Sequence, residues 1–191
     1  YRNTHPNIVF LSRHQDGFLR DRLVYNLKQC KNIAVIRLDA PLFFGNALFF
    51  ENKIISFLSE HHKVNHIILV AGAISQIDAT GTEVLTNLIT SLNNSGKEIY
   101  MANIKYSAET LFQRTGVWEL VKPSHFYPTT QIAVKEVIKM LELENNHTDS
   151  KHCPLAEYVR PSSKNLTKDK NLLSAIANKY LLKAFPKNYS K

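Results

Sequence analysis

The stretch from Val64 to Lys97 constrains the fold of this chain more than any other. It begins with the apolar run Ile67–Val70, which is rich in β-branched residues and typical of a strand buried on both faces. A short polar turn at 75–81 follows. The apolar residues beyond the turn fall on one face of a helix: Val84, Leu85, Leu88, Ile89 and Leu92. Gly96 stands where helices commonly end, so the pattern predicts one strand–turn–helix unit.

The same alternation continues on both sides of this unit. Further strands are predicted at 8–11, 33–38 and 98–102, with a brief edge strand at 117–121. Further helices are predicted at 46–61, at 107–114 and from 128 onward, and a loop with one helical turn at 12–31. We expect Ser107 to be the N-cap of the helix at 107–114 and Gly116 to end it. Strands alternating with helices predict an α/β fold, with a central mixed or parallel β-sheet and helices packed on it.

Positive charge is concentrated toward the C-terminus. Residues 144–191 carry 9 Lys or Arg against 4 Asp or Glu, so 9 − 4 = +5 of the formal net charge of +8 lies there. The core pattern ends near Leu143, which predicts a domain at 1–143 and a basic linker and tail at 144–191. The tail contains an amphipathic helical pattern at 172–185. It favours contact with anionic lipid or an acidic protein, and we expect no nucleic-acid partner.

The chain contains two cysteines, Cys30 and Cys153, in no CxxC arrangement. This usage does not indicate a disulfide framework and is typical of a reducing compartment. The chain begins at Tyr1 instead of methionine, so we interpret it as part of a longer protein. Its apolar stretches are shorter than the roughly 20 residues of a spanning helix, and we expect this part to be soluble.

The turn of the strand–turn–helix unit at 64–97 contains the first candidate site: Asp78, Thr80 and Gly81. A hydroxyl at a helix start is exposed, and the neighbouring N–H groups have no intrahelical acceptors. A phosphate on Thr80 would therefore be tolerated locally and would change the charge of the surface. The alternative interpretation is that Asp78 or Thr80 only caps the helix.

Other chemical motifs are weak. His61, His62 and His66 straddle a predicted helix end and strand start, and His147, His152 and Cys153 lack a fourth ligand at zinc spacing. Neither a GxGxxG or P-loop pattern nor a GxSxG elbow occurs. Asp39 and Asp78 both follow buried strands and are expected to lie near each other. We expect a non-enzymatic protein without a metal or cofactor.

The turn Asp78–Gly81, between a buried strand and a helix, and three further stretches resemble the STAS domain family over about residues 6–142. The entry strand is similar at 5–9, and the second-strand signature at 36–47 ends in Asn46-Ala47 before a helix. The stretch Phe126–Thr129, together with Ala133, is similar to the entry of the final helix. The family comprises anti-sigma factor antagonists and the cytoplasmic domains of sulfate permease (SulP) anion transporters, and these features favour the transporter branch.

The resemblance implies a regulatory or assembly role on the cytoplasmic side of the inner or plasma membrane, with transport performed by spans outside this chain. The expected partners are the membrane part of the same transporter and a second copy in a homodimer. The candidate interaction loop comprises Asp39, Phe43, Phe44 and Asn46. In the antagonist branch a phosphorylated serine occupies the position of Thr80. Two alternatives stay open: a soluble phospho-switched antagonist, and a small-ligand or nucleotide-binding module near Asp39 and Asp78.

Overall fold

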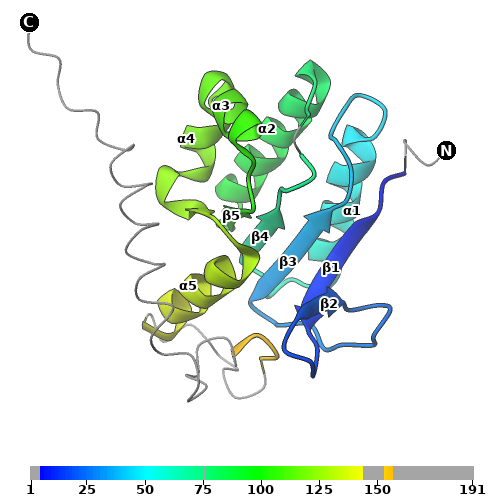
Figure 1. Ribbon diagram of the computed structural model, residues 1–191, viewed down its shortest axis with the longest axis vertical. Helices are drawn as coiled ribbons and strands as arrows, with labels where there is room; N and C mark the ends of the chain where they lie inside the picture. The colour runs from blue at the N-terminus through cyan, green and yellow to red at the C-terminus, as the bar shows by residue number, and fades with distance from the viewer. Residues whose placement is uncertain (1–4, 75, 144–152, 157–191) are drawn as a thin grey trace, which may run out of the picture. The chain divides into compact units, whose positions relative to one another are not determined.

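A mixed β-sheet forms the centre of the domain (Figure 1). We describe it from a computed structural model that covers residues 5–74, 76–143 and 153–156. Within these residues the strand order is β2-β1-β3-β4-β5-β6. The strands are β1 (Ile8–Arg13), β2 (Leu19–Asp21), β3 (Ile33–Leu38), β4 (His66–Val70), β5 (Glu98–Ala102) and β6 (Phe126–Tyr127). Strands β3 to β6 run parallel, and β1 is antiparallel to β2 and β3.

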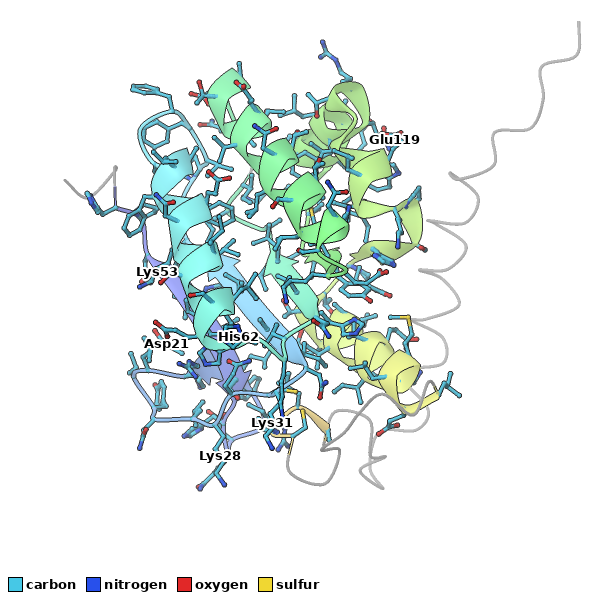
Figure 2. All side chains as sticks on the ribbon, turned by 180° about the vertical axis from the view of Figure 1, so that it is seen from behind. Asp21, Lys28, Lys31, Lys53, His62 and Glu119 are labelled. Atoms are coloured by element: carbon cyan, nitrogen blue, oxygen red, sulfur yellow. The ribbon has the colours of Figure 1, made fainter. Side chains whose placement is uncertain are left out.

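Helices cover both faces of this sheet (Figures 1 and 2). They are α1 (Ala47–Glu60), α2 (Ala79–Asn94), α3 (Tyr106–Thr115), α4 (Val117–Val121) and α5 (Thr130–Leu143), with a short 3₁₀ turn, η1, at Pro123–His125. Helix α1 packs beside α2, whereas α5 contacts β4, β5 and β6 from the opposite side. The predicted α/β architecture is therefore confirmed.

Alternate strand residues divide the core into two layers. Ile36, Leu69 and Met101 belong to one buried cluster with apolar residues of α1 and α2. Since side chains alternate across a strand, Ile68 and Tyr100 point to the other face, which α5 covers. Both faces of β3 and β4 are thus largely buried, which explains their mostly apolar sequences, with Arg37 and His66 as the half-buried exceptions.

Residues 117–121 form helix α4, so the predicted edge strand is wrong. Gly116 adopts a left-handed φ of 79° that ends α3 and starts α4 without a connecting loop. Val117 and Val121 are buried at helical spacing, and Trp118 stacks on Phe126 with ring centroids 3.8 Å apart. The edge strand of the sheet is instead β6.

Two further local predictions differ from the structure. Helix α3 begins at Tyr106 after Lys105, so Ser107 lies inside the first turn and is not the N-cap. The segment 12–31 contains strand β2, which pairs with β1 and was not predicted. The carboxylate of Asp21 accepts the Leu23 N–H at 2.9 Å and starts the turn that follows β2.

The structure also describes four residues beyond α5. Cys153, Leu155 and Ala156 are buried, although the sequence pattern assigns them to a linker. The rest of 144–191, including the predicted amphipathic helix at 172–185, lies outside the described residues. Among the described residues no helix has the length and hydrophobicity needed to cross a membrane.

Candidate functional site

Asp78 joins the two segments that the sequence marked as candidate sites. It is the N-cap of α2, and its Oδ1 accepts the Gly81 N–H at 2.7 Å. Its Oδ2 accepts the Phe44 N–H at 3.0 Å, from the loop between β3 and α1. These backbone hydrogen bonds, led by the one from Gly81, hold the pKa of Asp78 below its ordinary value. An ionised carboxylate therefore fixes the loop to the helix.

Gly81 allows this loop to approach the helix closely. Leu42 forms a parallel bridge with Ile77, and the Leu42 carbonyl accepts the Asp78 N–H at 3.3 Å. A Cβ atom at position 81 would lie 2.7 Å from the same Leu42 oxygen. The glycine is therefore required by packing, because α2 touches the loop backbone directly.

Asn46 shapes the loop from inside. Its side-chain oxygen accepts the Phe43 N–H at 3.0 Å, and its Nδ2 donates to the Pro41 carbonyl at 2.9 Å. The residue is buried, and its side chain makes no capping bond to α1. Asn46 thus sets the loop conformation and offers no surface of its own to a partner.

The outer side of the same region is apolar and exposed. Phe44 is 75% exposed and Leu48 62% exposed, and the Phe43 and Phe44 rings meet edge to face at 5.7 Å. Thr80 is exposed in the first turn of α2, on the helix whose start holds Phe44. We call Phe44, Leu48 and Thr80 the loop surface. The Thr80 hydroxyl does not cap α2, because Asp78 is the N-cap of this helix.

Asp39 and Asp78 line one open cleft of about 1020 Å³, Asp39 directly after β3 and Asp78 as the N-cap of α2. Asp39 accepts bonds from Arg37 Nε at 2.6 Å and Arg37 Nη2 at 3.0 Å, and from Asn7 Nδ2 at 3.1 Å. The hydrogen bond to Asp39 raises the pKa of Arg37. Both carboxylates in the cleft therefore already have partners within the protein.

The part of the cleft lining that α3 supplies was not predicted from the sequence. Ser107, Thr110 and Arg114 line the cleft from α3. Their spacing of three and seven residues places them on one helical face, and this polar stripe could have been read from the sequence. Arg114 adds a cation to a cleft that contains two carboxylates.

Among the described residues, His61, His62 and His66 belong to no group of side chains that could hold a metal ion. His61 stacks on Phe57 with ring centroids 4.1 Å apart, whereas His66 Nδ1 lies 3.1 Å from the Tyr100 hydroxyl. His62 is exposed after the end of α1 (Figure 2). His147 and His152 lie outside the described residues.

A further histidine, His125, is packed where η1 meets β5. Its ring stacks on Tyr100 at 4.3 Å, and its Nδ1 lies 2.9 Å from the Ile99 carbonyl oxygen. Burial lowers the pKa of His125 below 6.5. The neutral ring is therefore the form that the fold favours, with its Nδ1–H donating to Ile99.

Comparison with known proteins adds a family and a fold. The family model described as "STAS domain" matches residues 25–133. "Sulfate transporter 4.1, chloroplastic" from Arabidopsis thaliana is 22% identical over 76% of this chain and 23% of its own length. The chain spans about a quarter of the length of the curated relatives it matches.

Two solved structures share the fold. The murine Solute Carrier 26 family member A9 anion transporter, in its inward-facing state, matches with a TM-score of 0.66 and 22% identity, over 72% of this chain and 23% of that one. A putative anti-sigma factor antagonist from Thermotoga maritima matches with a TM-score of 0.50 and 24% identity, over 58% of this chain and 92% of that one.

Proposed function

The chain belongs to the STAS domain family, as its sequence motifs predicted, and from this premise we propose that it is the cytoplasmic regulatory and assembly domain of a SulP-like anion transporter. It acts through protein contacts and not through catalysis. The anion is of the sulfate or bicarbonate type, and the membrane part of the same protein is the main partner. The names of the curated relatives and of the murine transporter support this choice.

The loop surface is the observation that carries the proposal. Single exposed apolar residues are ordinary on protein surfaces. Here, however, the backbone beneath Phe44 is held by Asp78, and Asn46 holds the loop between Pro41 and Phe43. An aromatic side chain on a fixed backbone loses little conformational freedom when a partner covers it. The geometry therefore suits docking.

A soluble phospho-switched antagonist is the second candidate. It is supported by the exposed Thr80 at the start of α2 and by the fold shared with the Thermotoga maritima protein. A phosphate on Thr80 would lie near the positive end of the helix dipole, on the helix whose N-cap Asp78 accepts the Phe44 N–H, so it would alter the charge of the same loop surface. Both candidates therefore use one surface with different partners.

The reading frame upstream of Tyr1 separates these candidates. The transporter proposal expects about ten or more apolar segments of roughly 20 residues each. A start codon close to Tyr1 would refute it and leave the antagonist. This test of the upstream reading frame is independent of the role proposed for the loop surface.

Anion uptake by the full-length protein in proteoliposomes then tests the loop surface. Leu48→Ser should change the uptake rate because it removes an exposed apolar contact without disturbing the core. Leu23→Ser is the matched control, since Leu23 is 70% exposed in the turn after β2. Equal uptake by both variants and the wild type would refute docking through the loop surface.

A further inference from the structure

Two thiols that are 123 residues apart in the sequence meet inside the domain. Cys30 lies in the loop between β2 and β3, and Cys153 lies beyond α5. The Cys153 thiol donates a hydrogen bond to Cys30 Sγ with the sulfur atoms 2.7 Å apart. Both cysteines are in the thiol form, and their residues are 2% and 8% exposed. The contact was not predicted from the sequence, because no local sequence pattern connects the two cysteines.

The Cys30 side of this pair is held firmly. Ser12 Oγ of strand β1 donates to the Lys28 carbonyl at 2.6 Å. Gln29 Nε2 donates to the carbonyls of Cys30 at 2.9 Å and of Ile33 at 2.7 Å. The loop, marked by Lys28 in Figure 2, is therefore tied to strands on either side of it. Cys30 keeps its position when the opposite segment moves.

The Cys153 side is a short turn that packs on the domain. The Ala156 N–H donates to the Cys153 carbonyl at 3.1 Å, and Leu155 and Ala156 are buried with the thiol. Figure 1 draws this turn in orange, beside the loop that precedes β3. Burial of its apolar side chains brings Cys153 to the same place each time the turn closes.

We propose that Cys30 and Cys153 are a modification site, a thiol pair that oxidises to an intramolecular disulfide and fastens the segment after α5 to the loop before β3. The sulfur atoms need to approach by well under one ångström to reach the about 2.05 Å of a disulfide bond. A small disulfide such as oxidised glutathione is the oxidant. The S–S bond of oxidised glutathione and both cysteine S–H bonds break, the Sγ–Sγ bond forms, and the two glutathione sulfurs take up the two electrons and two protons and leave as two reduced glutathione molecules.

The environment makes this exchange slow. The hydrogen bond to Cys30, together with burial, raises the pKa of the Cys153 thiol. The thiolate is the attacking species, so exchange requires the turn at 153–156 to open first. The same burial protects the disulfide from reductants once it has formed. The pair therefore behaves as a slow cross-link that holds the start of the basic tail, and not as a rapid sensor.

The disulfide equilibrium of the 191-residue chain tests this proposal. The chain is equilibrated in reduced and oxidised glutathione, acid-quenched and alkylated, and the intramolecular disulfide is measured by intact mass and peptide mapping. The same measurement is made in concentrated guanidinium chloride, where the thiols meet only by chance. We expect the equilibrium constant for the disulfide to be about 100-fold larger in the folded chain. The comparison uses the unmodified sequence, so no variant has to fold.

Equal or smaller constants in the folded chain would overturn the proposal. It would also fail if oxidation gave mainly glutathione adducts or disulfide-linked dimers at equilibrium. Cys30→Ser and Cys153→Ser provide the mass standards for those two products. In the wild type they should stay minor at equilibrium, because the neighbouring thiol has a far higher effective concentration than free glutathione or a second chain.

Discussion

Gly81→Ala should destabilise the domain although it places a better helix former in α2. Alanine favours a helix interior over glycine by about 1 kcal/mol. Against this, the new Cβ would lie 2.7 Å from the Leu42 carbonyl oxygen, whereas ordinary contact begins at 3.4 Å, so the loop must retreat by 3.4 − 2.7 = 0.7 Å. Overpacking of this kind costs about 1–3 kcal/mol. Lengthening the Asp78–Leu42 hydrogen bond costs about 1 kcal/mol more.

The balance is a net loss of about 1–3 kcal/mol in the free energy of unfolding. Urea denaturation followed by circular dichroism measures it. Gly72→Ala is the control, because its Cβ would meet nothing closer than 3.5 Å, and it should change stability by less than about 0.5 kcal/mol.

Amide hydrogen exchange shows where Gly81→Ala disturbs the structure. The retreat of the loop should weaken the hydrogen bond from the Phe44 N–H to Asp78, so amide exchange at Phe44 should accelerate in Gly81→Ala. Stability equal to or above that of the wild type, with unchanged exchange at Phe44, would refute the requirement for glycine.

Three further outcomes are expected. Leu155→Ala should lower the free energy of unfolding by about 2–4 kcal/mol because Leu155 is buried. In the same denaturation assay Leu143→Ala should lower it by almost nothing, because Leu143 is 85% exposed, and equal losses would refute packing of the turn at 153–156. Thr80→Glu should leave the thermal midpoint almost unchanged and weaken partner binding, and an unfolded variant would contradict its surface position. The pKa of His125 is lowered by folding, so the unfolded chain binds the extra proton and stability should fall as pH decreases through about 6.5. His125→Gln should make stability depend less on pH in this range than His62→Gln does. Identical pH dependence in the two variants would show that His125 does not cause the loss of stability.

The sequence predicted the elements whose burial leaves a periodic signal. Strand β3 matches its predicted bounds because both faces are covered, so every residue from Ile33 to Leu38 except Arg37 is buried. Helix α2 was recognisable because its buried residues, from Gly81 to Leu92, recur on one helical face. Asp78 and Asp39 line one cleft, but Asp78 lies there as the N-cap of α2 and not at the end of β4, which is Val70.

Elements defined by distant partners were not predicted. The five residues of α4 are too few to show a helical period, and their place is set by Gly116 and by the stacking of Trp118 on Phe126. Strand β2 is mixed in polarity and exists because β1 pairs with it. Likewise, the contact between Cys30 and Cys153 depends on the whole fold and has no local signature.

The two outer strands of the sheet limit how copies of this domain can associate. Within the described residues, β2 has three residues and β6 has two. Strands this short expose only a few unpaired N–H and C=O groups, so a strand from another molecule gains little by adding to either side. Joining of sheets between copies, which leads to open-ended aggregates, is therefore disfavoured. A homodimer of this domain should instead bury side-chain surfaces on its helices and loops.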